Sequence, residues 1–386
     1  MKEVRIGVIG LGGMGTNHMR SVLLTPGAKL TAVCDIRKEV VDKVAAENKV
    51  KGFYDGEEMM KSGDVDAVII VTPHFDHTVK AVAAFKHGVH VLTDKPIAVH
   101  KADAQKMIDA HKKRPDLKFA AMFNMRTDSL YIKIKNLIET GELGEIHRVN
   151  WIITNWFRSQ SYYNSGGWRA TWRGEGGGVL LNQCPHQLDL FQWFFGMPVK
   201  IRAFCQVGRY HNIEVEDDVT AYCQYKNGST GVFIASTGEA PGTNRLEITC
   251  DRGRLIVEDG KITFNRAEIP VSKFIKTSTT GFGLPPIWHV DVPSGNDRMA
   301  HQKIIANYVD AILNGTPLIA PGEEGIKSVE LSNAMLYSSI KDKTVDMPLD
   351  GKAFEKILNG LIKNSRFVKP KEQKIKNNDL SKSFVK

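Results

Sequence analysis

The feature that most constrains the fold is a glycine pattern directly behind the first apolar run of the chain. Residues 4–9 have the apolar, β-branched character of a short strand, residues 16–24 have the pattern of an amphipathic helix, and G-x-G-x-x-G lies between them. In such a unit the first glycine permits a tight turn, the second lets a pyrophosphate approach the backbone, and the third lets helix and strand pack closely. The helix N-terminus then faces the phosphates. The predicted dinucleotide contacts in this turn are Gly10, Gly12, Gly13, Met14 and Gly15.

The end of the second predicted strand distinguishes between two dinucleotides. Residues 29–34 lead into Asp35, twenty residues after Gly15. A carboxylate there can accept hydrogen bonds from both hydroxyls of the adenosine ribose and would repel a 2′-phosphate, which favours NAD. Arg37 is the opposing feature, because an arginine beside the ribose can accommodate the 2′-phosphate of NADP. NAD is therefore the predicted cofactor, and NADP is the alternative.

Strands and helices alternate through the rest of this region. We predict strands over 65–71, 89–93 and 117–122, with helices over 77–87 and 101–111 between them. This alternation predicts a parallel, doubly wound Rossmann sheet whose ligands lie at the carboxyl ends of the strands. Two loops at that edge carry further predicted cofactor contacts, namely Thr72, Pro73, His77, Asp94 and Lys95.

From residue 145 onward the pattern changes to short strands separated by turn residues. Sequences such as Asn227-Gly228 and Asp259-Gly260 are typical of hairpins, so a mostly antiparallel sheet is expected. The predicted strands are 145–155, 199–207, 218–225, 229–236, 245–250 and 254–257.

An aromatic segment lies within this second half. Four of the six tryptophans fall between residues 151 and 172. Aromatic planes suit the C–H faces of a sugar or polyol, although the same rings could instead fill a core or a subunit interface. Arg158 and Arg169 could bind an acidic sugar or brace the loop. The predicted substrate contacts are Trp172, Arg173 and Tyr163, of which Arg173 adjoins a run of three glycines.

Composition excludes several classes of protein. With 386 residues, 42% hydrophobic and 25% charged, the chain has the make-up of a soluble two-domain protein, and no apolar run is long enough to cross a membrane. The net charge of +9 does not indicate nucleic-acid binding, because residues 366–386 hold seven basic and two acidic residues, five of the nine net charges. We predict a solvated tail there, or a strap onto a neighbouring subunit. Five dispersed cysteines and no metal-ligand pattern indicate a reducing, cytoplasmic setting without a metal site.

Taken together, these motifs resemble the Gfo/Idh/MocA oxidoreductases, which are related to glucose–fructose oxidoreductase and inositol 2-dehydrogenase. The resemblance implies a nicotinamide-binding Rossmann domain over residues 1–124 and a domain over 125–365 with an open, mostly antiparallel sheet. In many relatives that sheet also forms the interface of a dimer or tetramer, and the late helices could pack back on the first domain. The matching features are the glycine turn, Asp35, Thr72-Pro73 with His77, Asp94-Lys95-Pro96, Trp172-Arg173, Gly176 to Asn182 with His186, and 306–337.

Two positions depart from the family pattern. Asp94 stands where the family usually has glutamate, and Asn182 stands where the dehydrogenases usually have aspartate. Because an amide cannot take up a proton, the burden of proton transfer is expected to fall on His186 and Lys95. The four-residue spacing places Asn182 and His186 on one face if the segment is a single helix.

The resemblance implies oxidation of a ring hydroxyl of a sugar, glycoside or cyclic polyol. His186 is the predicted base, Lys95 stabilises the alkoxide, and Asn182 positions the substrate. Asp189 either orients the imidazole or contacts other parts of its helix, and His77 and His301 are further pocket candidates. Two alternatives stay open, a redox-neutral enzyme with tightly held NAD and a non-catalytic regulator that senses NAD and sugar.

Overall fold

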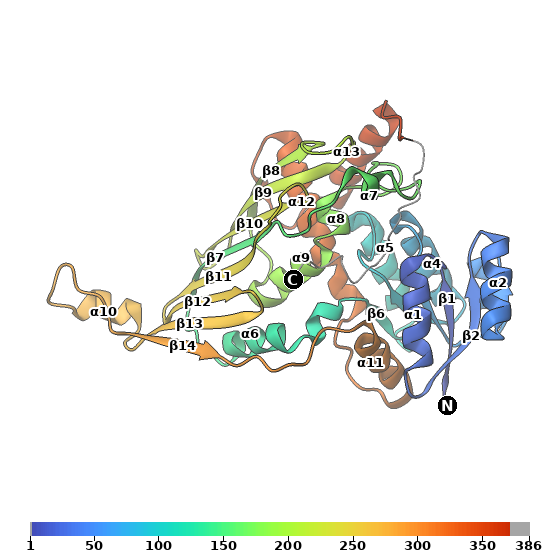
Figure 1. The fold of residues 1–386 in the computed structure, drawn as a ribbon, viewed down its shortest axis with the longest axis horizontal. Helices are drawn as coiled ribbons and strands as arrows, with labels where there is room; N and C mark the ends of the chain where they lie inside the picture. The colour runs from blue at the N-terminus through green and yellow to red at the C-terminus, as the bar shows by residue number, and fades with distance from the viewer. Residues whose placement is uncertain (1, 371–386) are drawn as a thin grey trace.

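The computed structural model describes residues 2–370, which form two units (Figure 1). The first is a six-stranded sheet in the order β3-β2-β1-β4-β5-β6, and every neighbouring pair is parallel, which confirms the predicted doubly wound sheet. Strand order reverses between β1 and β4, the place where such sheets hold their ligands. The elements are β1 (Val4–Ile9), α1 (Gly13–Leu23), β2 (Ala28–Cys34), α2 (Lys38–Asn48), β3 (Lys51–Phe53), α3 (Gly56–Lys61), β4 (Ala67–Ile70), α4 (His74–Lys86), β5 (His90–Thr93), α5 (Lys101–Lys112) and β6 (Phe119–Ala121).

The second unit is built on a nine-stranded sheet in the order β14-β13-β12-β11-β7-β10-β9-β8-β15. All neighbouring pairs are antiparallel except β7 with β10, so the prediction of a mostly antiparallel sheet is confirmed. Its strands are β7 (Ile146–Ile153), β8 (Lys200–Val207), β9 (Glu216–Gln224), β10 (Thr230–Ser236), β11 (Asn244–Cys250), β12 (Gly253–Glu258), β13 (Lys261–Ala267), β14 (Ile287–Val292) and β15 (Val345–Asp346).

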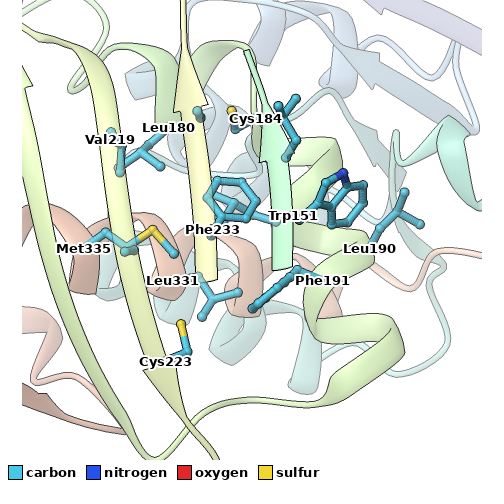
Figure 2. Packing of buried hydrophobic residues seen from close by; sticks show 14 of the residues in the cluster. Trp151, Leu180, Cys184, Leu190, Phe191, Val219, Cys223, Phe233, Leu331 and Met335 are labelled. Atoms are coloured by element: carbon cyan, nitrogen blue, oxygen red, sulfur yellow. The ribbon is translucent and has the colours of Figure 1, made fainter. Parts of the chain in front are cut away.

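Helices cover one face of this sheet and join it to the first unit. Trp151 of β7 and Phe233 of β10 pack on Phe191 and Met335 from two helices beneath them (Figure 2). Phe204 of β8 is exposed, and the predicted oligomer interface on this sheet stays a prediction. The helices are η1 (Asn124–Thr127), α6 (Ser129–Glu139), α7 (Gln160–Asn164), α8 (Val179–Asn182), α9 (Pro185–Phe195), α10 (Val271–Thr277), α11 (His301–Asn314), η2 (Gly322–Glu324), α12 (Gly325–Lys341) and α13 (Gly351–Asn364).

The late part of the chain returns to the first unit. Helix α11 lies against α1 (Figure 1), and Ile304, Ile305 and Tyr308 are part of the core beneath the parallel sheet. Residues distant in sequence therefore complete the Rossmann core, and the domain boundaries at residues 124 and 365 stay a prediction. No helix in the described part of the chain is long and apolar enough to span a bilayer.

Several elements were not predicted, and the shortest of them have weak sequence signals. Strand β3 has only three residues, which are too few to show an alternation of polar and apolar residues. Strand β14 lies at the edge of its sheet and exposes most of its side chains. Helices α2 and α3 and strands β13 and β15 were also missed. The predicted basic tail, residues 366–386, lies mostly outside the described residues.

The condition for placing Asn182 and His186 on one face of a single helix is not met. The segment from Asn182 to His186 is not a single helix, because α8 ends at Asn182 and α9 begins at Pro185. Proline has no N–H for a helical hydrogen bond to Leu181, and it occupies the first turn of α9, where that donor is not needed. The break therefore leaves carbonyl groups at the end of α8 without their helical donors.

A buried ion pair holds α9 against two other segments. Arg126 of η1 makes a bidentate contact with Asp189, at 2.8 and 2.7 Å, and the side chains of both are 1% exposed. Its third contact is Glu324 of η2 at 2.6 Å. Asp189 therefore pairs with Arg126, which settles its role as a structural contact of α9.

We predict that Arg126→Met lowers the free energy of unfolding by about 3–5 kcal/mol, because it leaves a buried carboxylate without its cation. Urea denaturation measures the change. Arg114→Met, which removes an exposed pair with Asp116, is the matched control and should lower the free energy of unfolding far less than Arg126→Met. Equal losses for the two variants would contradict the importance of the buried pair.

Candidate active site

The three glycines of the first turn meet three different steric demands. Gly10 has a φ of 100°, and a Cβ there would lie 2.6 Å from the Val71 carbonyl oxygen. A Cβ on Gly15 would lie 1.8 Å from the Gly10 oxygen, so helix α1 packs too closely on β1 for a side chain. Gly12 has nothing within 4 Å of such an atom and leaves its backbone open to the cavity. This is the arrangement that a pyrophosphate on the turn requires.

A cavity of about 760 Å³ extends from this turn to the second unit. At its other end lie Lys95 and Asn182, with the loop from Gly166 to Arg169 on one side. The Thr72 hydroxyl oxygen is buried and has no hydrogen-bond partner in the described residues, so a ligand could satisfy it. The predicted cofactor residues that line the cavity are Gly10, Gly12, Gly13, Met14, Gly15, Asp35, Arg37, Thr72, Pro73, His77, Asp94 and Lys95.

Asp35 holds Arg37 in a fixed position. The Asp35 carboxylate accepts two hydrogen bonds from the Arg37 guanidinium, both at 2.9 Å, and one from the Leu11 amide at 2.8 Å. Burial alone would raise the pKa of Asp35, but these donors outweigh it and hold the pKa below its ordinary value. Because the guanidinium is committed to this carboxylate, Arg37 does not offer a free cation to a 2′-phosphate, which fits NAD.

Asp94 and His77 brace the two loops that carry the cofactor contacts. The Asp94 carboxylate accepts a hydrogen bond from the Lys95 amide at 2.7 Å and lies 3.2 Å from His18 Nε2 of α1. The ring nitrogens of His77 lie 2.8 and 2.7 Å from the carbonyl oxygens of Pro96 and Thr72. The shorter carboxylate at position 94 is therefore anchored by the helix that follows the glycine turn.

Lys95 and Asn182 meet through a backbone contact between the two units. Lys95 Nζ donates to the Asn182 carbonyl oxygen at 2.8 Å. Burial lowers the pKa of Lys95, and the Asp94 and Glu175 carboxylates oppose that effect. The lysine is thus held at the end of α8 as a hydrogen-bond donor, and it makes no side-chain ion pair with Asp94 among the described contacts.

His186 lies in the first turn of α9, next to this contact. It is 6% exposed, and its Nδ1 has no hydrogen-bond partner in residues 2–370. Burial lowers its pKa well below 6.5, and the charges of Lys95 and His301 add to that effect. His186 is not among the residues that line the large cavity, but it is a neutral imidazole close enough to Lys95 to respond to its charge.

The structure brings a different set of residues to the substrate end than the sequence predicted. Tyr163 is buried and shares a hydrogen bond with Thr237 at 2.7 Å, Trp172 is buried, and Arg173 is exposed; none of them is among the residues lining the cavity. Gly166, Gly167, Trp168 and Arg169 line it instead. The sequence signal that could have identified this loop is the glycine pair Gly166-Gly167 directly before an aromatic and a basic residue.

Two further contacts around Asn182 were not predicted. Tyr162 donates its hydroxyl to Asn182 Oδ1 at 3.3 Å and accepts a hydrogen bond from Arg169 at 2.7 Å. The Asn182 amide nitrogen donates to Glu175, a buried carboxylate that directly precedes the three glycines. Lys369, from the start of the predicted tail, donates to the Arg169 carbonyl oxygen at 2.7 Å, so this part of the tail contacts the site loop of its own chain.

Residues 4–121 match the family described as "Oxidoreductase family, NAD-binding Rossmann fold", and residues 131–256 match the "GFO/IDH/MocA C-terminal domain". The chain belongs to the GFO/IDH/MocA family of oxidoreductases. Its first unit is therefore the NAD-binding domain of the family, as the glycine turn and Asp35 indicated.

Several members of the family are similar to this chain. The myo-inositol 2-dehydrogenase of Thermotoga maritima is 27% identical over 272 residues, 67% of this chain and 77% of that enzyme. The inositol 2-dehydrogenase of Salmonella typhimurium is 34% identical over 147 residues, which span 37% of this chain and less than half, 43%, of that enzyme. The WlbA dehydrogenase of Chromobacterium violaceum, solved with NADH and UDP-GlcNAcA, has a TM-score of 0.78 at 26% identity, covering 91% of this chain and 97% of that one.

We predict that Asp35→Ala weakens NADH binding by roughly tenfold to hundredfold, since hydrogen bonds to a charged group are lost. It should also narrow the preference for NADH over NADPH, because the repulsive carboxylate is gone and Arg37 is released. Fluorescence titration with both reduced cofactors measures the ratio of dissociation constants. Arg37→Ala is the control and should keep the preference for NADH; an unchanged ratio in Asp35→Ala would argue against this role.

Proposed function

We propose that this oxidoreductase transfers a hydride from a ring secondary hydroxyl of a sugar, glycoside or cyclic polyol to NAD. The observation that carries the proposal is the hydrogen bond from Lys95 to the end of α8, with His186 in the first turn of α9, where its Nδ1 has no hydrogen-bond partner among residues 2–370. The relatives named for inositol and the neighbour solved with a nucleotide sugar support the substrate class.

The proposed chemistry removes a hydride from carbon and a proton from oxygen. NAD, held by the glycine turn and Asp35, supplies the hydride acceptor when bound. Lys95 has further N–H donors besides the one used by Asn182, and one of them can donate to the substrate hydroxyl oxygen and lower its pKa. His186 takes the proton of that hydroxyl. The products are a ketone, NADH and one proton, so atoms and electrons balance.

The environment of the site suits these roles. Burial lowers the pKa of His186, so the imidazole is uncharged above that pKa and can accept a proton, and the same lowering makes it a weaker base than an exposed histidine. Trp168 and Arg169 line the cavity where the substrate would lie and can offer an aromatic plane and polar contacts to a ring with several hydroxyls. Asn182 retains one amide N–H for a substrate oxygen, since the other is used by Glu175.

The decisive experiment is a panel of inositols, sugars and glycosides, assayed with NAD and with NADP. Reduction of NAD with at least one of these compounds is expected. Purified protein that binds neither dinucleotide would overturn the proposal. NAD that co-purifies, together with product formation without net NADH, would favour the redox-neutral alternative.

We predict that Lys95→Met lowers turnover by about a hundredfold or more, since it removes the donor that stabilises the alkoxide while keeping the length of the side chain. NADH titration and thermal melting should be close to those of the unsubstituted protein. Lys118→Met, a lysine of the same domain away from the cavity, should retain activity. Near-normal turnover of Lys95→Met would remove the lysine from the chemistry.

A pH prediction follows from the buried imidazole. His186 can accept a proton only above its own pKa, and that pKa lies well below 6.5, so kcat/KM should stay constant as the pH falls through 6.5 and decrease only at lower pH. NADH binding measured across the same range separates this effect from cofactor loss. An acid limb at or above pH 6.5, with constant NADH binding, is the contrary result.

A further inference from the structure

Glu175 is a buried carboxylate that the proposed chemistry does not use. It is 1% exposed and lies between the cavity loop and the three glycines that lead into α8. One carboxylate oxygen accepts from the Asn182 side-chain amide, and the other accepts from the Ala170 backbone amide at 2.6 Å. Ala170 has a φ of 60°, an uncommon backbone conformation for a residue other than glycine. Glu175 therefore joins the cavity loop to Asn182, the position at which the resemblance to the family implies an aspartate.

These contacts fix the direction of the Asn182 side chain. Its Oδ1 lies 3.3 Å from the hydroxyl of Tyr162 and 3.3 Å from the amide of Gln183, both of which donate to it. Its nitrogen faces Glu175, and an ionised carboxylate accepts hydrogen bonds but cannot donate them. The two ends of the amide are thus distinguished by their partners, and Asn182 is among the residues that line the cavity.

We propose that Glu175 is a positioning residue. Its carboxylate binds the Asn182 side chain and provides the negative charge that the family usually carries on a carboxylate at position 182. This inference rests on the proposed dehydrogenase function, because it assigns Glu175 a part in that site. The Glu175 carboxylate orients the side-chain amide of Asn182. Its negative charge also favours the charged form of Lys95, which contacts the carbonyl oxygen of Asn182.

Electrostatics agree with this geometry. The charge of Glu175 raises the pKa of Lys95, against the larger lowering by burial. Burial raises the pKa of Glu175 itself, while the charge of Arg169 and the hydrogen bonds from Asn182 and Ala170 oppose that effect. The charged and titratable groups that face Glu175 from the surrounding segments are Lys95, Arg169, Lys369, Glu216, Tyr163 and His74.

The test exchanges the acid and the amide between the two positions. We would compare the full-length protein with Glu175→Gln, Asn182→Asp and the double variant, using the substrate that the panel identifies. Glu175→Gln should lower kcat by roughly tenfold to hundredfold, since a hydrogen bond to a charged group is lost. It should also move the basic limb of the pH profile to lower pH, because Lys95 loses a nearby negative charge. The double variant should regain activity relative to Glu175→Gln and return that limb toward its original position.

Two controls distinguish a positioning role of Glu175 from a merely structural role. Glu330→Gln changes another buried carboxylate, bound to Lys101 and distant from the cavity, and should leave the pH profile in place. NADH titration and melting temperatures identify any variant that fails to fold. A Glu175→Gln variant that folds, with an unshifted basic limb and kcat within twofold, overturns the proposal, and so does a double variant less active than both single variants.

Infrared titration tests Glu175 without any substrate. The carboxylic-acid C=O band that disappears in Glu175→Gln should be present only on the acid side of the activity range. If that band persists in the unsubstituted protein throughout the active pH range, Glu175 is uncharged there and the proposal fails. If no compound of the panel is oxidised, the proposed substrate class fails while this titration still decides the ionisation of Glu175.

Discussion

The hydrogen bond from Lys95 Nζ to the Asn182 carbonyl oxygen is the contact on which the site depends. It joins a loop of the parallel sheet to the glycine-led segment of the second unit, so neither unit forms the site alone. The carbonyl is available because α8 ends at Asn182 and α9 begins only at Pro185. A continuous helix would offer this oxygen an amide donor from its next turn. The break that separates Asn182 from His186 is therefore also what lets Lys95 bind between the two units.

The parts of the protein that could be predicted are those where the local backbone geometry or a nearby hydrogen-bond donor requires one particular residue type. Gly10, Gly12 and Gly15 each satisfy a separate steric limit, and Asp35 ends its strand where the turn needs an acceptor. The substrate end could not be predicted in the same way. Tyr162 and Tyr163 are adjacent and chemically alike, yet one contacts Asn182 and the other is buried against Thr237. Both lie in the short helix α7, where adjacent side chains point in different directions, and five residues are too few to show a helical pattern in the sequence.

Long-range pairs were equally hidden in the sequence. Asp189 is one turn from His186, which made an imidazole contact plausible, but the residue it binds is Arg126, 63 positions earlier. Helix α11 completes the core beneath the parallel sheet although nearly two hundred residues separate it from β6. Neither pairing follows from spacing along the chain, because both are set by how the two units pack. The resemblance to a family supplied the order of the motifs, but not these contacts.

The position of the carboxylate behind Asn182 has a consequence for the two groups that handle the proton. Lys95 must stay charged to donate, whereas His186 must stay neutral to accept, although the two are close enough for the lysine charge to lower the pKa of the histidine. The charge of Glu175 acts on Lys95, while the charges that act on His186 come from Lys95, His301 and Asp94. A carboxylate at position 182 itself would lie at the end of α8, four positions before the imidazole in the sequence, and its negative charge would raise the pKa of His186 as well. In the proposed role of Glu175, its negative charge raises the pKa of Lys95 and is not among the charges that act on His186.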